Sequence, residues 1–352
     1  MDAKKLIEYL ESSFLKPLLV DQNVTDISYN GEAIFYVDNN KGRCKSDIIM
    51  DSQTIKDFIR QIANLSEKQF SFQSPELDVS FGRYRLSAQH QSISRKNNEE
   101  CISFSFRLSS PDLRIESDGD FLSQEIIDLL DVLIYSNVSI VIGGLTGSGK
   151  TELQKYLITR MPLFTRVIII DNILELDQMR TSTDLDLNIW QVDEKRESTT
   201  IQRLVKTALR SNPDWLIVAE SRGKEMLEVL NSSLTGHPII TTVHAFDINT
   251  MPVRMVRMVM MNEQKMNFED VYNDISYHMR FYIYLKRKYT NNGCVKRYIS
   301  SIAYLYDKKM EEIYGSDGSN KKYYQLTKQA IKMLDLTKAS DLFIKTFLGG
   351  QE

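Results

Sequence analysis

The first third of the chain carries short stretches in which hydrophobic and polar residues alternate. Such alternation is typical of strands with one buried face, and it predicts strands over residues 24–28, 33–37, 79–91 and 101–107. Apolar residues spaced by three and four positions predict helices over residues 1–20 and 52–66. The dipeptide Asn30–Gly31 favours a hairpin turn, because both residues tolerate positive φ. This part is therefore predicted to be a small α+β domain on an antiparallel sheet.

The pattern changes after residue 120. The predicted strands there are apolar throughout, over residues 138–142, 167–170, 215–218 and 239–243. Helical patterns over 126–135, from about 150 and near 198–210 separate them. Continuously apolar strands separated by helices indicate a parallel sheet covered on both faces. The predicted organisation is an N-terminal domain over 1–108, a turn-rich linker over 109–120 and an α/β domain over 121–352.

Composition excludes several classes of protein. Lys and Arg number 44 against 47 Asp and Glu, and this balance disfavours a protein that coats nucleic acid. No apolar run approaches the roughly 18 residues of a membrane span, and the first residues lack the features of a signal peptide. Cys44, Cys101 and Cys294 are scattered, which disfavours disulfide frameworks and zinc clusters and indicates a reducing cytoplasm. We therefore expect a cytoplasmic globular protein.

The clearest chemical signal is the segment 144–151, which reads GLTGSGKT. It matches the phosphate-loop pattern G-x-x-x-x-G-K-[ST] and lies between a predicted strand and a predicted helix, as that motif requires. Glycines allow backbone N–H groups to curl round phosphates at the positive end of the helix. In such loops the lysine, here Lys150, reaches the β and γ oxygens, and the hydroxyl of Thr151 binds Mg²⁺. The predicted ligands of ATP are Gly144, Thr146, Gly147, Ser148, Gly149, Lys150, Thr151 and Glu152.

A phosphate loop needs an acidic residue at the end of a neighbouring strand, and the sequence offers two candidates. The strand over 215–218 leads to Glu220, which could polarise the attacking water or hold Mg²⁺ through water. The strand over 167–170 leads to Asp171, and either Asp171 or Glu175 could also join the site. His237 and His244 flank the strand over 239–243. A single histidine is usually structural, but two at the ends of one strand favour a functional role.

Four blocks together resemble the secretion ATPase superfamily, the hexameric motors of type IV secretion, conjugation, type II secretion and type IV pilus machines. They are residues 144–151, 170–176, 208–223 and 235–245, in the family's order. Weaker likeness at 24–31 and 82–87 resembles the family's PAS-like N-terminal domain, and 279–285 and 300–306 resemble its closing strands. The resemblance implies a RecA-like P-loop ATPase domain preceded by a PAS-like α+β domain. Within the superfamily, the type IV secretion and tight-adherence pilus branch is the most similar.

The resemblance also implies roles for matched positions. Glu220 becomes the catalytic carboxylate, Glu175 a second acidic residue near water and Mg²⁺, and His244 a γ-phosphate sensor. Thr151, Glu220 and Glu175 form the implied metal site. The remaining matches are arginines: Arg210 and Arg222 at subunit boundaries, and Arg83, Arg85 and Arg107 in the N-terminal domain, where family arginines close over the phosphates. From the residues alone, the last three are better explained as strand arginines on a solvated face.

Three departures from the family pattern bear on the rate of hydrolysis. Asn172 replaces the second acid of an acidic pair, so it cannot bind Mg²⁺ as an anion. Ala219 replaces a glycine before the catalytic carboxylate, which leaves less room beside the backbone. The stretch between His237 and His244 is one residue shorter than usual.

The implied function is an ATP-hydrolysing hexamer that works at the inner face of the cell membrane through partner proteins, without inserting into the bilayer. An ATP-binding assembly scaffold with negligible hydrolysis is one alternative, supported by Asn172 and Ala219. A nucleic-acid translocase with a similar core is another, although the balanced charge weighs against stable nucleic-acid binding. Its support is one basic region, which a solvated hairpin face explains better; the region comprises Arg280, Lys286, Arg287, Lys288, Lys296 and Arg297.

Overall fold

The computed structural model describes residues 2–110, 113, 115, 121–172, 176–177, 184–193, 196–263, 266–290 and 294–349. The chain forms two compact units: unit 1 comprises residues 1–112 and 289–296, and unit 2 comprises residues 113–288 and 297–352. The linker predicted over 109–120 falls largely outside the described residues.

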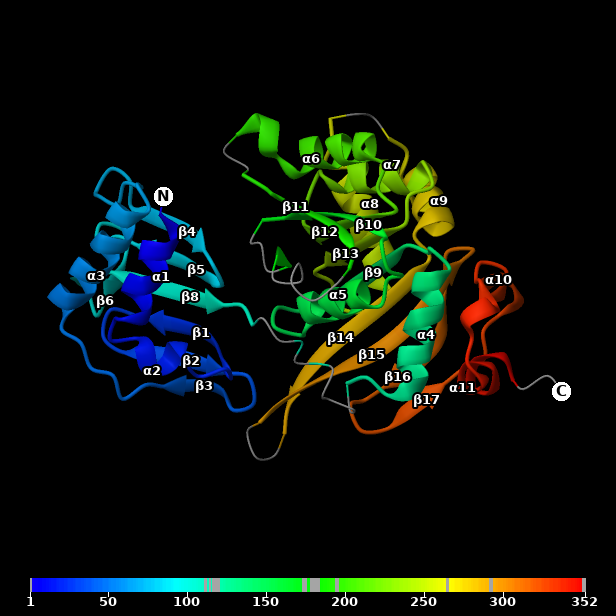
Figure 1. Ribbon diagram of the computed structural model, residues 1–352, viewed down its shortest axis with the longest axis horizontal. Helices are drawn as coiled ribbons and strands as arrows, with labels where there is room; N and C mark the ends of the chain where they lie inside the picture. Colours follow the sequence, from blue (N-terminus) through cyan, green and yellow to red (C-terminus); the bar gives the residue numbers. More distant parts are fainter. Residues whose placement is uncertain are drawn as a thin grey trace. The chain divides into compact units, whose positions relative to one another are not determined.

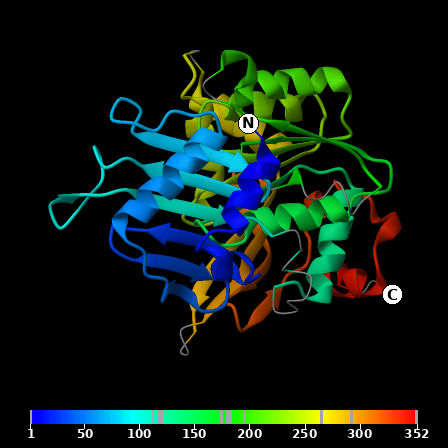
Figure 2. The same ribbon diagram turned by 60° about the vertical axis from the view of Figure 1, so that its left-hand side comes forward.

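Unit 1 is built on a six-stranded antiparallel sheet with the strand order β3-β2-β1-β8-β5-β4. Its helices pack on one face of the sheet (Figure 2), and their apolar side chains join those of the strands in one core. The prediction of an antiparallel α+β architecture for this part is confirmed. The elements are α1 (Ala3–Glu11), α2 (Lys16–Leu19), β1 (Val24–Tyr29), β2 (Ile34–Asp38), β3 (Gly42–Lys45), α3 (Ser52–Leu65), β4 (Glu76–Phe81), β5 (Tyr84–Gln89), β6 (Arg95–Lys96), β7 (Glu99–Glu100) and β8 (Ser103–Leu108).

Two element boundaries in unit 1 differ from the prediction. The helix predicted over 1–20 is two helices, α1 and α2. The strand predicted over 79–91 is the hairpin β4–β5, which reverses at Gly82 with a φ of +52° that favours glycine. Local turn chemistry overrides the alternating pattern there. In the predicted hairpin turn, Gly31 has a φ of +94°, and the Asn30 side chain accepts the N–H groups of the two residues that follow Gly31.

Unit 2 contains a nine-stranded sheet in the order β11-β10-β12-β13-β9-β14-β15-β16-β17. The pairs from β11 to β14 are parallel, as predicted, and the pairs β15–β16 and β16–β17 are antiparallel. The strands are β9 (Ile140–Gly144), β10 (Arg166–Asp171), β11 (Asp186–Gln191), β12 (Trp215–Ser221), β13 (Ile239–Val243), β14 (Phe281–Tyr289), β15 (Val295–Tyr306), β16 (Lys309–Ser316) and β17 (Lys321–Tyr323).

Helices cover both faces of this sheet, which explains why its central strands are apolar throughout (Figure 1). Along β10, Val167 and Ile169 belong to one core cluster, while Ile168 and Ile170 belong to the cluster on the opposite face. One face carries α4 (Gln124–Tyr135), α5 (Lys150–Thr159), α10 (Lys328–Ile331) and α11 (Asp341–Phe343); the other carries α6 (Ile201–Ala208), α7 (Met226–Leu234), α8 (Thr250–Val259) and α9 (Phe268–His278). Short 3₁₀ turns lie at Glu197–Thr199, Leu209–Ser211 and Leu336–Lys338, and a π-helical turn at Ile344–Leu348.

The strand order positions the site. Because β13 lies between β12 and β9, and all three run in the same direction, their carboxyl ends meet at one edge of the sheet. That edge carries the phosphate loop after β9, His244 after β13 and Glu220 near the end of β12. None of the helices in the described part of the chain is both long and apolar enough to cross a bilayer.

Candidate functional site

The phosphate loop connects β9 to α5 through glycines in conformations that other residues avoid. Gly144, Gly147 and Gly149 have φ values of +153°, +74° and +101°. A methyl group on Gly144 would lie 2.5 Å from Oγ of Ser148 and 2.7 Å from the Leu285 carbonyl oxygen, so the loop has no room for one. Gly149 is the N-cap of α5 and supplies no capping side chain. The first N–H groups of α5 therefore remain available to an anion.

Lys150 lies inside this loop and is only 9% exposed. Its Nζ donates to the carbonyl oxygens of Gly144 at 3.0 Å and Leu145 at 3.2 Å. The Leu145 carbonyl also accepts the N–H of Ser148 at 3.3 Å. The buried hydroxyl of Ser148 has no hydrogen-bond partner among the described residues. These donors converge on one small volume, where the oxygens of a phosphate group would satisfy them.

The remaining predicted loop residues occupy less enclosed positions. Thr146 is exposed, and Thr151 lies half-buried in the first turn of α5. Glu152 forms an ion pair with Lys155 at 3.2 Å, and the Lys155 side chain is only 4% exposed. The pair balances a carboxylate that would otherwise repel phosphate near the positive end of α5. A nucleotide-binding role for Glu152 stays a prediction.

Glu220 occupies a β-bulge in β12. Val218 pairs with Thr241 of β13, but Ser221 pairs with Val243, so β12 holds one extra residue in this interval. The Thr242 hydroxyl donates to the Ala219 carbonyl at 2.8 Å and holds the bulge against β13. Bulges redirect side chains near active sites. Ala219 and Glu220 are both half-buried as a result, rather than alternating between the two faces of the sheet.

The side chains of Arg222 and His244 face the Glu220 carboxylate. Nη2 of Arg222 donates to Oε2 at 2.5 Å, and Nε2 of His244 lies 2.9 Å from Oε1. Burial raises the pKa of Glu220, but the hydrogen bond from Arg222 and the positive charges of Arg222 and Lys150 outweigh it, so the pKa lies below its usual value. Glu220 is therefore an anion at neutral pH.

His244 is the neutral member of the group. Burial and the charge of Lys150 lower its pKa, and the opposing effect of the Glu220 carboxylate does not reverse the shift. The imidazole is consequently uncharged at pH 7, with Nε2 directed at Glu220. A neutral ring can donate one hydrogen bond and accept another. The role of His244 as a γ-phosphate sensor stays a prediction.

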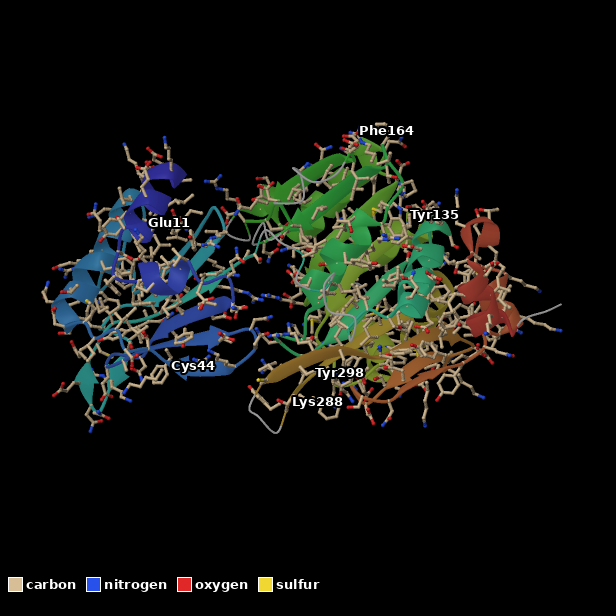
Figure 3. The ribbon with its side chains drawn as sticks, turned by 60° about the horizontal axis from the view of Figure 1, so that its bottom comes forward. Glu11, Cys44, Tyr135, Phe164, Lys288 and Tyr298 are labelled. Atoms are coloured by element: carbon tan, nitrogen blue, oxygen red, sulfur yellow. The ribbon has the colours of Figure 1, made fainter. Side chains whose placement is uncertain are left out.

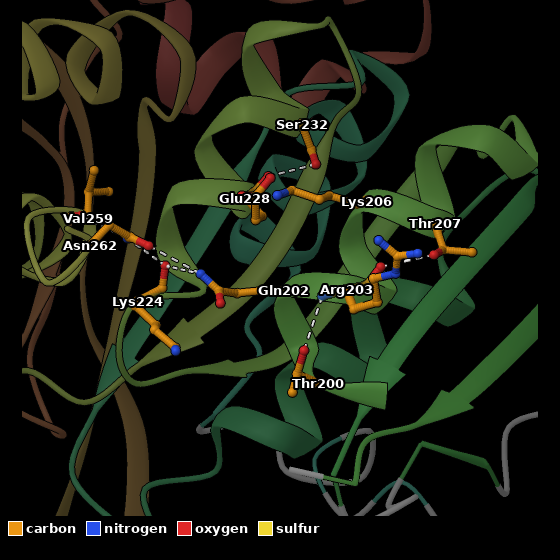
Figure 4. A network of polar contacts seen from close by, with 10 residues as sticks. All are labelled: Thr200, Gln202, Arg203, Lys206, Thr207, Lys224, Glu228, Ser232, Val259 and Asn262. Carbon is orange, nitrogen blue, oxygen red and sulfur yellow. Dashed lines mark hydrogen bonds and ion pairs between the residues drawn. The ribbon is translucent and has the colours of Figure 1, made fainter. Parts of the chain in front are cut away.

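The turn that follows Glu220 is held by residues that the sequence did not single out. Oε1 of Glu225 accepts the backbone N–H groups of Arg222 and Gly223. The Lys224 carbonyl accepts the side-chain amides of Gln202 and Asn262, so α6 and the end of α8 both fasten the turn (Figure 4). The turn is thereby fixed on three sides, and with it the position of Arg222. The contacts of Gln202 and Asn262 with Lys224 are identified only by the tertiary structure, since these partners lie far apart in sequence.

Tyr284 holds the segment that follows His244. It is on β14, which pairs directly with β9, and it is 2% exposed. Its hydroxyl donates to the carbonyl oxygens of Ala245, at 3.0 Å, and Phe246. A hydroxyl carries one hydrogen, so these two consecutive carbonyls share it. Tyr284 therefore links the strand beside the phosphate loop to the backbone next to His244.

The second acidic candidate is only partly defined. Asp171 ends β10, the neighbour of β12, and is buried. Its Oδ2 accepts the N–H of Leu176 at 3.4 Å, and Asn172 beside it is half-buried. Glu175, predicted as a catalytic and metal-binding residue, lies outside the described residues. Its role stays a prediction.

The structure does not bring His237 and Arg210 to this edge. His237 precedes β13 and His244 follows it, so the two histidines lie at opposite ends of the strand. They flank β13 as predicted, but only His244 is at the edge of the phosphate loop; His237 contacts Thr235 through Nδ1 at 3.1 Å. Arg210 lies before the amino end of β12 and is exposed, whereas Glu220 is near the carboxyl end. Its assignment to a subunit boundary remains a prediction.

The three N-terminal arginines belong to unit 1. Nη2 of Arg83 donates to the Leu19 carbonyl at the end of α2 at 2.6 Å, a structural contact that caps this helix. Arg85 and Arg107 are direct partners on β5 and β8, on the sheet face opposite the helices. The proposed contact of these three residues with phosphates stays a prediction.

The residues present suit Mg²⁺ bound together with a nucleotide. No group of three or more His, Cys, Asp and Glu that could hold a metal ion by itself occurs within the described ranges. Mg²⁺ usually keeps several waters and binds through one or two protein oxygens plus substrate phosphates. The Thr151 hydroxyl and the ionised Glu220 carboxylate are hard oxygen donors of this kind, and Oε1 of Glu220 is buried without an aligned hydrogen-bond donor. The site therefore fits the ion.

Comparison with known proteins agrees with these features. The family described as Type II/IV secretion system protein matches residues 109–279. An uncharacterised protein of Bacillus anthracis is 28% identical over 87% of this chain and 71% of its own length. The type IV secretion system protein VirB11 of Brucella suis is 30% identical over 43% of this chain and 42% of its own length.

The similarity extends to a solved structure. The X-ray structure of the ATPase DotB of Legionella pneumophila superimposes with a TM-score of 0.62 at 20% identity, covering 87% of this chain and 81% of DotB. At this identity the likeness concerns the fold. The family match carries the identification: over residues 109–279, which include the phosphate loop, the chain belongs to the type II/IV secretion system protein family.

Proposed function

We propose that the chain is an ATP-hydrolysing motor of a type IV secretion, conjugation or type IV pilus machine. One observation carries the proposal: an ionised Glu220, paired with Arg222 and His244, stands at the same sheet edge as a phosphate loop that contains Lys150. A carboxylate at this edge can activate water against a phosphate held by the loop. VirB11 of Brucella suis is described as a type IV secretion system protein, and the matched family as type II/IV secretion system proteins, which supports the choice of machine.

The residues would divide the reaction between them. Lys150 exchanges its two carbonyl partners for oxygens of the β- and γ-phosphates and stabilises their charge. Glu220 orients the attacking water and accepts its proton, while the water oxygen bonds to the γ-phosphorus and the bond to the bridging oxygen of ADP breaks. His244 lies between the two on the intervening strand. Mg²⁺, held by Thr151 and Glu220, supplies neutralisation of the phosphate charge when bound.

The working assembly is proposed to be a ring of copies, a hexamer by analogy with the family, at the cytoplasmic face of the membrane and attached through partner proteins. Two exposed arginines support an assembly of copies. Arg222 is 59% exposed although it is bound to Glu220, and Arg210 is exposed on the opposite edge of the sheet. Arginines at such positions can complete the site of a neighbouring subunit.

Specific ATPase activity is expected to rise with protein concentration, because sites completed by a neighbour's arginines require assembly. Steady-state hydrolysis of Mg-ATP over a hundredfold range of protein, with oligomer size measured on the same samples, checks this. A constant specific activity from a monomer would contradict the ring. Tight ATP binding without hydrolysis would indicate the scaffold instead, and Asn172→Asp would then be the first variant to test.

Removal of the Arg222 charge is expected to shift the acidic limb of the pH–rate profile to higher pH. Arg222 lowers the pKa of Glu220, whereas burial raises it. Without the guanidinium this lowering effect is lost, so Glu220 becomes protonated at a higher pH than in the wild type and the base is lost there. Values of kcat for the wild type and Arg222→Gln between pH 5 and 8 test this. An acidic limb at the same pH in both proteins would show that another group controls it.

Loss of the Tyr284 hydroxyl is expected to lower kcat more than it changes ATP affinity. Tyr284→Phe frees the segment after His244 but leaves the phosphate loop intact. One hydrogen bond of about 1 kcal/mol corresponds to roughly a fivefold loss in kcat. Tyr282→Phe is the matched control, since this tyrosine is also fully buried on β14 and its hydroxyl has a weak contact, to the Met255 sulfur at 3.9 Å. Equal kcat values in the two variants would refute the assignment.

A further inference from the structure

Two arginines on the strands next to the phosphate loop lie against the loop itself. β14 pairs with β9 as far as Leu285 opposite Gly144, so the residues after Leu285 continue beside the loop. Nε of Arg297, on β15, donates to the Gly147 carbonyl at 2.8 Å. A methyl group on Gly147 would lie 3.0 Å from Nη1 of Arg287, on β14. Both guanidinium groups thus reach the middle of the loop, and both belong to unit 2.

The hydrogen bond from Arg297 fixes the direction of one peptide group. In a trans peptide the C=O and the following N–H point in opposite directions. A Gly147 carbonyl that is held toward Arg297 therefore turns the Ser148 N–H to the inner side of the loop. There it meets the Leu145 carbonyl, which also accepts Nζ of Lys150. The two donors that would bind a phosphate are gathered at one point, and Arg297 holds one of them in place from outside.

Arg297 also lies close to Gly149, the next glycine of the loop. A methyl group on Gly149 would lie 3.6 Å from the ring of Phe121 on one side and 3.8 Å from Cδ of Arg297 on the other. Gly149 is the N-cap of α5, so the Arg297 side chain runs along the loop from its middle to the start of the helix. Its guanidinium charge stays close to the phosphate position, where it attracts an anion as well as orienting the backbone.

We propose that Arg297 is a positioning residue of the phosphate loop, and that Arg287 adds a second positive charge from the neighbouring strand. The ligand is the diphosphate or triphosphate chain of a nucleotide, so the inference rests on the proposed function and deepens it. The family resemblance implied arginines from the N-terminal domain and from subunit boundaries. Arg297 and Arg287 belong instead to unit 2, the unit that contains the phosphate loop.

The other basic residues of the same region have different partners. Nζ of Lys288 donates to the Asp317 carbonyl at 2.9 Å and lies 5.6 Å from the centre of the Tyr298 ring; Figure 3 labels Lys288 and Tyr298. Arg280 donates to the Tyr277 carbonyl and the Tyr304 hydroxyl. Both residues remain partly exposed, so the interpretation of the region as a solvated face stays a prediction. Among Arg280, Lys288 and Arg297, it is Arg297 that donates to the phosphate loop.

Loss of Arg297 is expected to weaken nucleotide binding more than it slows the chemical step. Charge-assisted hydrogen bonds of this type correspond to an effect of about ten- to hundredfold. Because ground state and transition state both use the oriented loop, KM for ATP should rise while kcat changes less. ADP should lose affinity by a similar factor, since its β-phosphate occupies the same loop. Arg297→Lys, which keeps the charge and a donor, should recover part of the loss.

The test measures Mg-ATP and Mg-ADP binding by titration calorimetry on the full chain, together with KM and kcat. The variants are Arg297→Ala, Arg297→Lys and, as a control with the same loss of charge on the same hairpin, Lys288→Ala. The expected result is weaker binding of both nucleotides by at least about tenfold in Arg297→Ala, partial recovery in Arg297→Lys and near-unchanged binding in Lys288→Ala.

Lys150→Ala separates failure of this inference from failure of the proposed function. If Lys150→Ala loses nucleotide binding but Arg297→Ala binds like Lys288→Ala, the role of Arg297 is refuted and the nucleotide site stands. If Lys150→Ala binds nucleotide like the wild type, both are refuted. Thermal unfolding without nucleotide confirms that each variant folds; should Arg297→Ala not fold, Arg297→Gln replaces it, with the same outcomes.

Discussion

Replacement of Glu220 by glutamine is expected to reduce kcat for ATP hydrolysis by about 10²- to 10⁴-fold, the usual contribution of a general base. Glutamine keeps the shape of the side chain and an oxygen that can accept from Arg222, so the bulge in β12 should persist. It cannot accept the proton of the attacking water. The measurement is steady-state phosphate release under saturating Mg-ATP.

Binding should survive in the same variant. Glu220 carries negative charge at neutral pH, so its removal does not weaken attraction of the phosphates by Lys150. Glu263→Gln is the matched control, because Glu263 is exposed and the chemical change is identical. If Glu220→Gln retained wild-type turnover, the base would have to be another carboxylate at this edge, and Asp171, at the end of the neighbouring strand, would be the next to test.

Replacement of Lys150 by alanine is expected to weaken nucleotide binding by at least about 100-fold, because a charge-assisted hydrogen bond contributes about 1.5–3 kcal/mol and Lys150 would make more than one to the phosphates. The side chain is buried in the loop, and no other lysine of this loop can take its place. Binding can be followed through stability. A ligand at 100 times its Kd stabilises a protein by about 2.7 kcal/mol, so Mg-ATP should raise the thermal midpoint of the wild type and leave that of Lys150→Ala unchanged.

The variant itself should fold. Lys150 donates to carbonyls of its own loop, and its removal takes a buried charge out of the protein. Lys224→Ala serves as the control, because this side chain is exposed and only its backbone carbonyl joins the network of Figure 4. An equal rise of the thermal midpoint with Mg-ATP in wild type and Lys150→Ala would contradict a phosphate-binding role for the loop.

The fold class could be predicted because the strands signal it locally. Residues 167–170 are all apolar since both faces of β10 are covered, and residues 24–28 alternate since β1 has one buried face. Boundaries were less accurate. A reversal at a single glycine, Gly82, divided one predicted strand into β4 and β5. No strands were predicted at β16 and β17, because partly exposed antiparallel strands show only a weak pattern of apolar residues.

The sequence by itself determined the phosphate loop, because its glycines, Lys150 and Thr151 are consecutive and their geometry is local. It also nominated Glu220, as an acid that ends an apolar strand. Only the tertiary structure decided what surrounds them. The family resemblance had implied a role for His244 and not for His237, and the direction of β13 gives the spatial reason, because it puts one histidine at each edge of the sheet.

The contacts of Tyr284 and Arg297 likewise depend on β14 and β15 lying beside β9, although these strands are more than a hundred residues away in sequence. Strand order in a parallel sheet is set by pairing between distant segments and by the packing of helices on both faces. Residue spacing along the chain carries no record of that order. Local chemistry can therefore be predicted from the sequence, whereas the partners that tune it come from the fold.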